Sequence, residues 1–232
     1  MKTQTFSVGH VPAALYGEKS DKLFLFVHGL GGSHEEGARF AEVACPFGFQ
    51  VLAVDLPGHG GRRDGLPLVP WVAVPELQEV MRYAKERYAR IAVRAISLGT
   101  WLSLVAFDGQ RVEKCLFSSP LVDMERMILS IMHAAGVSEE RLATEKEIPV
   151  PGGQTLSWEY LCWVRRHPVR ALCSDTALFR ATEDEMIPRD TVVAFAEKNA
   201  CRLTEYKGGQ HWLHTPEEVA AMTAWERAKF AR

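Results

Sequence analysis

Short apolar runs alternate with longer amphipathic stretches along most of the chain, and this alternation restricts the fold more than any other feature. Six runs have the length and composition of buried strands: 23–27, 51–54, 91–96, 114–117, 177–181 and 202–206. Such runs, separated by helical segments, are typical of a mostly parallel sheet with helices on its faces. Residues 5–8 and 13–16 predict an antiparallel hairpin that precedes it. The sequence therefore predicts an α/β fold.

Helix-start signals fall between these strands. Ser33 is followed three residues later by a glutamate, and this capping box predicts a helix that runs to about residue 44. Pro75 is predicted to begin the next helix, because proline suits the first helical position. Thr215 and Pro216 give the same kind of signal for a last helix that reaches about residue 229.

Residues 119–175 break this rhythm, since one helix is usually enough to connect two parallel strands. The segment contains three stretches of helical pattern. We interpret it as a helical cap, inserted into a single domain of residues 1–232 and placed over the carboxyl ends of the strands, where open α/β sheets bind ligands. Its apolar residues predict a substrate pocket, and the alternative is that they only attach the cap to the core: Met127, Ile131, Trp158 and Trp163.

Bulk composition argues against several classes of function. The chain of 232 residues is 47% hydrophobic and has a net charge of −2, so neither nucleic acid nor an anionic membrane is an expected partner. Its apolar runs fall far short of the roughly 18 residues of a membrane span. Its five cysteines are scattered, with no C-x-x-C pair, which favours reduced thiols in a cytoplasmic protein over disulfides or zinc. No cofactor is implied, and the oligomeric state is left open.

Ser97 is the candidate nucleophile. It lies in the pentapeptide Ala95-Ile96-Ser97-Leu98-Gly99, between a predicted strand and an apolar helix. A serine on such a sharp turn needs small residues two positions away on either side, and the usual pattern is G-x-S-x-G. The helix amino end would also present free N–H groups to an anion. A plain helix-capping serine would explain the position of Ser97 but not the small flanking residues.

The glycine-rich loop His28-Gly29-Leu30-Gly31-Gly32, which follows the first buried strand, is the candidate oxyanion site. Two preorganised N–H donors stabilise the negative oxygen of a tetrahedral intermediate. Here the donors would be the backbone N–H groups of Leu30 and Leu98. A phosphate-binding loop is the competing interpretation, but the loop has no G-x-x-x-x-G-K-[ST] pattern.

These two motifs, with Asp55-Leu56-Pro57-Gly58-His59-Gly60 between them, resemble the α/β-hydrolase superfamily over about residues 20–225. The chain looks like a small bacterial serine esterase-type member. The resemblance implies an α/β-hydrolase fold with a mostly parallel eight-stranded sheet and a triad at its carboxyl ends. It also implies that Asp55 and His59 are architectural.

The family order of serine, acid and histidine points to Asp184 and His211 as the other members of the triad. Residues 181–188 resemble the family's acid loop, with Asp184 at the acid position, and 208–214 its histidine loop. Rival acids are Glu183, Glu185 and Asp123. His214 competes with His211, and an H-x-x-H metal pair of the two lacks a third ligand nearby, so no metal site is expected.

The sequence therefore predicts a serine hydrolase that cleaves a small-molecule carboxylic ester through an acyl-enzyme. Thioesterase, peptidase and acyltransferase activity use the same machinery and stay open, as does a non-catalytic binding protein with the same fold. Two arginines lie in strands that should be buried, Arg94 and Arg180, and they require partners. These partners are either carboxylates of the protein or an anionic part of the substrate.

Overall fold

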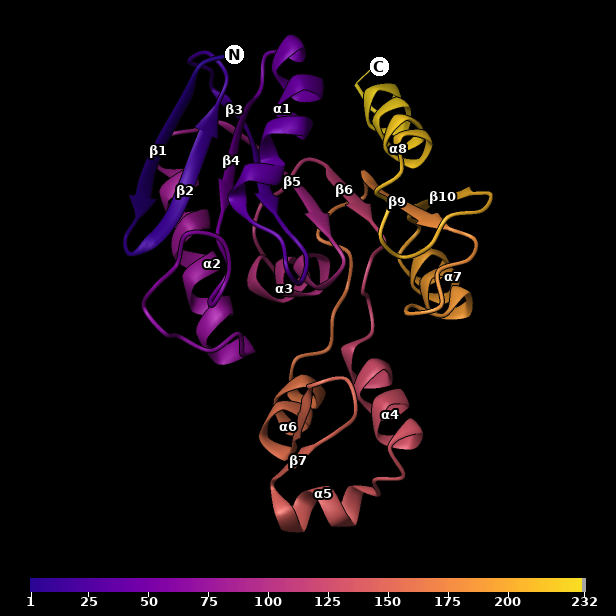
Figure 1. The fold of residues 1–232 in the computed structure, drawn as a ribbon. Helices are drawn as coiled ribbons and strands as arrows, with labels where there is room; N and C mark the ends of the chain where they lie inside the picture. The colour runs from indigo at the N-terminus through magenta and orange to yellow at the C-terminus, as the bar shows by residue number, and fades with distance from the viewer. Residues whose placement is uncertain (231–232) are drawn as a thin grey trace. The chain divides into compact units, whose positions relative to one another are not determined.

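The computed structural model describes residues 1–230, which form two compact units. Unit 1 comprises residues 1–122 together with the chain from Arg170 onward, and unit 2 comprises Asp123–Val169. Unit 2 lies within the stretch 119–175 that breaks the alternation of strands and helices. Each unit has its own secondary structure (Figure 1).

Eight described strands form the sheet of unit 1 in the order β1-β2-β4-β3-β5-β6-β9-β10. The hairpin strands β1 and β2 pair antiparallel, β2 is antiparallel to β4, and all other neighbours are parallel. The predicted mostly parallel eight-stranded sheet is thus confirmed. The strand bounds are Thr3–Val8, Val11–Tyr16, Lys22–Val27 (β3), Gln50–Val54 (β4), Arg90–Ile96 (β5), Cys115–Ser118 (β6), Thr176–Ala181 (β9) and Arg202–Tyr206 (β10).

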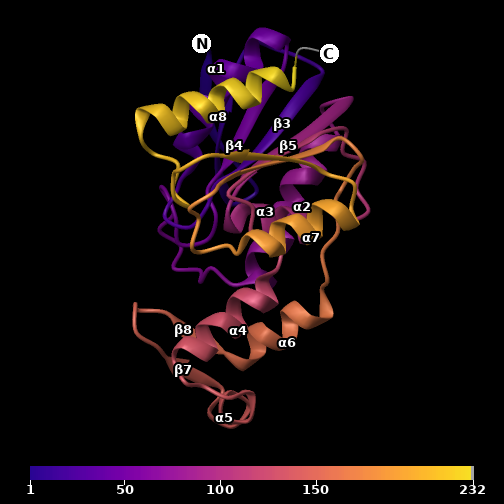
Figure 2. The same ribbon diagram turned by 90° about the vertical axis from the view of Figure 1, so that its right-hand side faces the viewer.

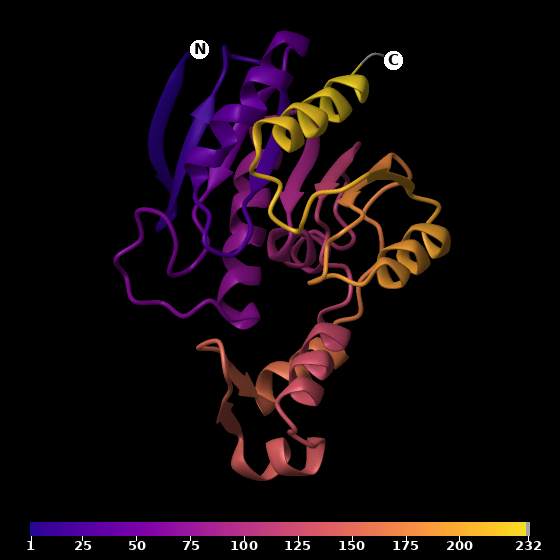
Figure 3. The ribbon, with the colours of Figure 1, turned by 45° about the vertical axis from the view of Figure 1, so that its right-hand side comes forward.

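Helices cover both faces of this sheet, as Figure 2 shows from the side. Helices α1 (Gly37–Ala44) and α8 (Pro216–Ala228) lie on one face, and α2 (Pro70–Lys85), α3 (Leu98–Ala106) and α7 (Arg189–Lys198) on the other. Although α1 and α8 are the first and last α-helices, they lie side by side (Figure 3). Ser33 caps a short 3₁₀ turn, His34–Glu36, by accepting the N–H of Glu35, and α1 begins after this turn.

The core between the sheet and α1 and α8 is aromatic. Phe24 and Phe26 point to the same face of β3, because side chains alternate along a strand. Phe24 meets Phe40 of α1 edge-on, with ring centroids 5.0 Å apart, and Trp225 of α8 belongs to the same cluster. This burial fixes both helices against the sheet.

Arg94 enters this core from β5 with no exposed surface. Its Nε donates to a carboxylate oxygen of Glu226 on α8 at 2.8 Å, and Arg39 of α1 donates two further bonds to the same carboxylate. Another guanidinium nitrogen of Arg94 donates to Ser118 and contacts the sulfur of Met222. Burial alone would raise the pKa of Glu226, but the charges of the two arginines outweigh burial and lower it. The partner of Arg94 is thus a protein carboxylate.

Arg180 of β9 is also buried, and it donates to Glu205, its register partner on β10, at 2.9 Å. Arg189 binds the same carboxylate from the solvent side. The adjacent strand therefore supplies the carboxylate that a buried arginine requires.

The predicted start of the second helix at Pro75 is wrong. Helix α2 begins at Pro70, which takes the first helical position, and Pro75 lies inside the helix. Pro75 costs one backbone hydrogen bond because it has no N–H. Proline does suit the first turn of a helix, as Pro70 shows. The sequence signal therefore predicted a helix start correctly but assigned it to Pro75 instead of Pro70.

Unit 2 combines three helices with a small hairpin. Its elements are α4 (Met124–Ala134), α5 (Glu139–Glu145), β7 (Glu147–Pro149), β8 (Thr155–Ser157) and α6 (Trp158–Arg166). The three helical stretches match the sequence prediction, whereas the antiparallel pair of β7 and β8 was not predicted. Arg165 of α6 links the helices by binding Glu125 and Glu139. Among the helices described for residues 1–230, none is long and apolar enough to cross a membrane.

We expect Glu226→Leu to lower the free energy of unfolding by about 3–5 kcal/mol, because it leaves Arg94 buried without its carboxylate. The control is Arg170→Ala, which breaks the exposed Arg170–Asp108 pair and should cost less than about 1 kcal/mol. Adding Arg94→Met to Glu226→Leu should restore part of the loss, since it removes the unpaired charge. Urea unfolding measures all three. Equal losses for Glu226→Leu and Arg170→Ala would contradict the importance of this pair.

Candidate active site

Ser97 occupies a strained turn between β5 and α3. Its backbone has φ 48° and ψ −120°, outside the regions that most residues adopt. Because Ser97 precedes the first residue of α3, its side chain lies at the amino end of the helix. Such strain persists only where the surroundings hold the residue in place, and it is common at functional sites.

Gly99 explains why this turn requires a small residue on its helical side. A Cβ atom at Gly99 would lie 2.3 Å from the carbonyl oxygen of His28 and 2.6 Å from that of Val27. Both carbonyls belong to the end of β3 and its following loop, so a larger residue would push α3 away from the sheet. Ala95, on the other side, lies within regular β5, where alanine is not strained. The departure from G-x-S-x-G is therefore harmless.

Ser97, His211 and Asp184 form a continuous hydrogen-bonded chain. The Ser97 hydroxyl lies 2.8 Å from Nε2 of His211, and Nδ1 of His211 lies 2.8 Å from Oδ2 of Asp184. His211 and Asp184 are buried, whereas Ser97 is partly accessible. The three residues follow β5, β10 and β9, all at the carboxyl ends of parallel strands. The structure thus brings the three predicted residues together.

Asp184 differs from the neighbouring glutamates because its side chain points at His211. Its second oxygen, Oδ1, accepts the backbone N–H groups of Met186 and Ile187 at 3.0 and 2.9 Å. Glu183 and Glu185 are exposed. Both oxygens of Asp184 are therefore engaged, which fixes the carboxylate against His211. The other rival, Asp123, caps α4 in unit 2 by accepting the N–H of Arg126.

Ser119 is a residue of this site that the sequence interpretation missed. It follows β6 and has a positive φ of 46°. Its hydroxyl donates to the backbone carbonyl of His211 at 2.7 Å, and its N–H donates to Phe179 of β9. Ser119 thus holds the histidine loop next to the sheet. The only sequence signal for Ser119 was the pair of serines at the end of β6, and such pairs are too common to indicate a functional residue.

The loop 28–32 lies directly beside Ser97. A Cβ at Gly29 would be 3.3 Å from the Cβ of Ser97, so the two chain segments are in close contact. Leu30 follows in the same loop with its side chain exposed, and Leu98 is the first residue of α3, where an N–H has no helical acceptor. The positions of both backbone groups are compatible with the predicted oxyanion site.

His28 connects this loop to the next one. Its Nδ1 lies 2.7 Å from the carbonyl oxygen of Gly29, and its Nε2 accepts the N–H of Leu56 at 3.0 Å. The ring is fully buried, and burial lowers its pKa to about 4 because the charged form loses its hydration. A neutral His28 with a fixed tautomer therefore orders the candidate oxyanion loop.

Asp55 and His59 support the neighbouring turn rather than the hydrogen-bonded chain of Ser97. Asp55 is buried and accepts the backbone N–H groups of His34 and Gly61, at 2.7 and 2.9 Å. The ring of His59 bonds to the carbonyl of Pro57 and packs against His28. These contacts are local and match an architectural role.

A cavity of about 380 Å³ opens beside Ser97. Its wall includes loop residues 29–32, Ile96, Ser119, the stretch 211–214 and Met222. Three large apolar side chains from separate loops are exposed around it: Leu30, Met186 and Trp212. Exposed apolar groups at a concave site are typical of ligand binding.

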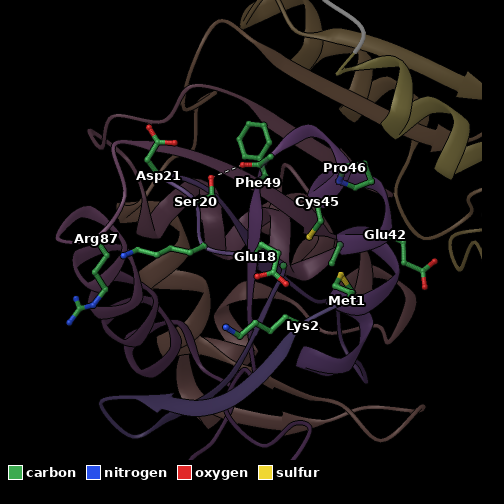
Figure 4. A pocket seen from close by; sticks show the side chains of 14 residues that line it. Met1, Lys2, Glu18, Ser20, Asp21, Glu42, Cys45, Pro46, Phe49 and Arg87 are labelled. Carbon is green, nitrogen blue, oxygen red and sulfur yellow. Dashed lines mark hydrogen bonds between the residues drawn. The ribbon is translucent and has the colours of Figure 1, made fainter.

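A larger hollow of about 980 Å³ lies elsewhere in unit 1 (Figure 4). Its wall includes Glu18, Asp21, Cys45 and Phe49, which precede or flank the amino ends of β3 and β4. It is thus at the opposite end of the strands from Ser97. Size alone would favour this hollow as the functional site, but the hydrogen bond between Ser97 and His211 favours the smaller cavity.

His214 does not take part in the hydrogen-bonded chain. Its ring is exposed, and its backbone N–H donates to Glu218 of the Thr215 capping box. Both ring nitrogens of His211 are already engaged by Ser97 and Asp184. Within residues 1–230, no group of three or more His, Cys, Asp or Glu side chains is arranged to hold a metal ion.

Comparisons with known proteins agree with the fold. A model of the alpha/beta hydrolase family matches residues 24–222. No curated protein matches the sequence significantly. Est1E from Butyrivibrio proteoclasticus, solved with ferulic acid, is 20% identical with a TM-score of 0.73, over 99% of this chain and 100% of that one.

Two further solved structures are similar. Alpha/beta hydrolase domain-containing protein 10 from mouse is 12% identical with a TM-score of 0.76, over 97% of this chain and 96% of that one. A thioesterase domain from the curacin biosynthetic pathway is 17% identical with a TM-score of 0.58, over 97% and 99% of the two chains. At these sequence identities, the similarity shows a shared fold and nothing more.

We expect His28 to make the protein less stable in acid. Between pH 6.5 and 4 the unfolded chain takes up a proton at residue 28 that the folded protein does not take up. The free energy of unfolding therefore falls by about 3 kcal/mol as the pH is lowered over this range. His28→Gln removes this titration but also its hydrogen bonds, so the variant starts less stable at pH 7. The stability gap between wild type and variant should therefore narrow toward pH 4 in urea unfolding. A gap that is constant with pH would contradict a buried neutral His28.

Proposed function

The chain belongs to the alpha/beta hydrolase family, and from this premise we propose that it is a serine hydrolase that cleaves carboxylic esters. The observation that carries the proposal is the chain of two 2.8 Å hydrogen bonds from Ser97 through His211 to Asp184. A hydroxyl, an imidazole and a carboxylate in this order form the constellation that activates a serine for acyl transfer.

The proposed reaction begins when Oγ of Ser97 attacks the ester carbonyl while Nε2 of His211 takes its proton. The developing oxyanion accepts hydrogen bonds from the backbone N–H groups of Leu30 and Leu98. His211 then returns the proton to the departing alcohol, which leaves an acyl group on Ser97. Water, activated by the same imidazole, releases the acid and restores the serine.

Asp184 serves this cycle by keeping His211 in one tautomer and one orientation. Because Met186 and Ile187 hold its other oxygen, the carboxylate stays fixed while the imidazole gains and loses a proton. The negative charge also stabilises the imidazolium that forms in each half of the reaction. The bond from Ser119 to the histidine backbone supports the same alignment.

The residues that line the cavity favour a neutral, apolar substrate. Leu30, Met186 and Trp212 offer apolar surface, while Glu36 adds a carboxylate that repels an anionic acyl group. A role of Met127, Ile131, Trp158 and Trp163 in binding the acyl chain is still a prediction from the sequence. These residues lie on α4 and α6 of unit 2.

Thioester cleavage is the second candidate, because one structural neighbour is a thioesterase domain. Peptidase and acyltransferase activity would need the same three residues. A panel of p-nitrophenyl esters of increasing chain length, a feruloyl ester, an acyl thioester and a peptide amide separates these activities. The feruloyl ester is included because the neighbour Est1E was solved with ferulic acid. We expect the neutral esters to be the best substrates.

We expect Ser97→Ala and His211→Ala each to lower the turnover of the best ester by roughly 10⁶-fold. A fluorophosphonate probe should label the wild-type protein but not Ser97→Ala. The matched control is His10→Ala, since His10 lies in the β1–β2 hairpin and should leave turnover unchanged. Wild-type protein that folds but neither reacts with the probe nor cleaves any substrate would favour a non-catalytic binding protein.

Asp184→Asn should lower turnover on the order of 10⁴-fold, because the amide favours the wrong histidine tautomer. Glu183→Gln and Glu185→Gln are the matched controls, and both should have small effects because these side chains are exposed. The measurement is the rate of p-nitrophenol release from each folded variant. If Asp123→Asn were instead the substitution that lowers turnover, the acid of the triad would be Asp123 and not Asp184.

A further inference from the structure

Three of the five cysteines come together where β6, β9 and β10 begin. Cys115 is the first residue of β6, Cys173 lies three residues before β9, and Cys201 lies one residue before β10. The sulfur atoms of Cys115 and Cys173 are 3.8 Å apart. The spacing of these residues in the sequence gives no sign of this proximity, which arises from the parallel pairing of β6 with β9.

The two neighbouring thiols have different surroundings. Cys115 is completely buried and its pKa is raised, chiefly because burial disfavours the thiolate. Cys173 is partly accessible, and its pKa is lowered to about 7, chiefly by the hydrogen bond between its sulfur and that of Cys115. A thiolate is the reactive form of cysteine. An accessible nucleophile therefore lies next to a buried protonated thiol.

The carboxylate that acts on Cys173 is itself paired with two cations. Asp175 is the carboxylate nearest in sequence to Cys173 and disfavours the thiolate, but it is paired with Arg202 of β10 and with Lys114. Cys201 lies close enough to interact electrostatically with both other thiols, and burial raises its own pKa to about 11. Of the three thiols, Cys173 is thus the one most readily ionised near neutral pH.

We propose that Cys173 and Cys115 form an oxidation site at which a peroxide converts two thiols into a disulfide. The sulfur of Cys173 attacks one oxygen of hydrogen peroxide, so an S–O bond forms, the O–O bond breaks and hydroxide leaves. Cys115 then attacks the sulfenic acid, forming the S–S bond and expelling the oxygen as water with the thiol proton. Overall, two thiols and one peroxide give a disulfide and two waters.

The local structure can accommodate this bond. A disulfide needs its sulfur atoms at about 2.05 Å, so the pair must approach by a little under 2 Å. Cys115 is held in the sheet, where its N–H donates to Asp175. Cys173 lies in the segment 170–175, which has no regular helix or strand and can supply the movement. The side chain that has to move is thus the accessible one.

The bond would close a covalent ring of residues 115–173, which contains the whole of unit 2. It would tie the segment by which the chain re-enters unit 1 to the amino end of β6. Ser97 lies at the other end of the strands, so this chemistry does not use the proposed hydrolase machinery. The Ser97→Ala variant should form the disulfide as the wild type does.

The test treats full-length Ser97→Ala protein with hydrogen peroxide and measures intact mass and free thiols. We expect a loss of about 2 Da, a fall in thiols from five to three, and a peptide in which Cys115 is linked to Cys173, all reversed by dithiothreitol. Cys162→Ser is the matched control, because Cys162 lies in unit 2 and should not alter the result.

Single substitutions of the pair separate the two steps. Cys173→Ser should abolish the loss of mass, whereas Cys115→Ser should leave a sulfenic acid on Cys173 that dimedone traps. Peptide mapping of the unsubstituted pair decides the matter even if a variant fails to fold. A disulfide between Cys173 and Cys201, addition of oxygen without a cross-link, or no change in mass would each overturn the proposal.

Discussion

The close contact between the β5–α3 turn and the end of β3 is the constraint on which the site depends. Gly99 lies against the carbonyl groups of Val27 and His28, and only a residue without a Cβ fits there. This contact lets α3 begin immediately after Ser97 and keeps the serine in its strained conformation. The same contact brings loop 28–32 beside the hydroxyl. Ser97 and the candidate oxyanion loop are therefore positioned by a single packing requirement.

A second set of contacts fixes the position of His211. His211 lies in the loop between β10 and α8, so its position depends on how α8 is attached to the sheet. Glu226 attaches α8 through bonds to Arg94 of β5 and Arg39 of α1. Arg94 also contacts Met222, which lines the cavity beside Ser97. The net contribution of a buried ion pair is small relative to a well-packed apolar pair, but this one fixes the helix that follows the histidine loop.

Local sequence signals predicted the sheet and the three residues of the hydrogen-bonded chain, because these depend on short motifs. The eight strands of the main sheet were predicted to within two residues, and Ser97 was identified by its small neighbours. Asp184 and His211 were identified by the resemblance of their loops to those of the family. Features that depend on long-range contact were missed, as with Ser119 and the proximity of Cys115 to Cys173. The partners of Arg94 and Arg180 were equally inaccessible, since pairing across a sheet or onto a helix leaves no trace in sequence spacing. Pro75 shows the reverse case, in which a local signal was overridden because a second proline began the helix earlier.

Parallel strands place different reactive groups at the two ends of the sheet. At the carboxyl ends, the loops after β5, β9 and β10 place a serine, an aspartate and a histidine within hydrogen-bonding distance. At the amino ends, the residues that precede or begin β6, β9 and β10 gather three thiols. The two sets of groups lie at opposite ends of these strands, so those at one end do not contact those at the other. The proposed site for acyl transfer and the proposed site for thiol oxidation therefore share one sheet without contact between their reactive groups.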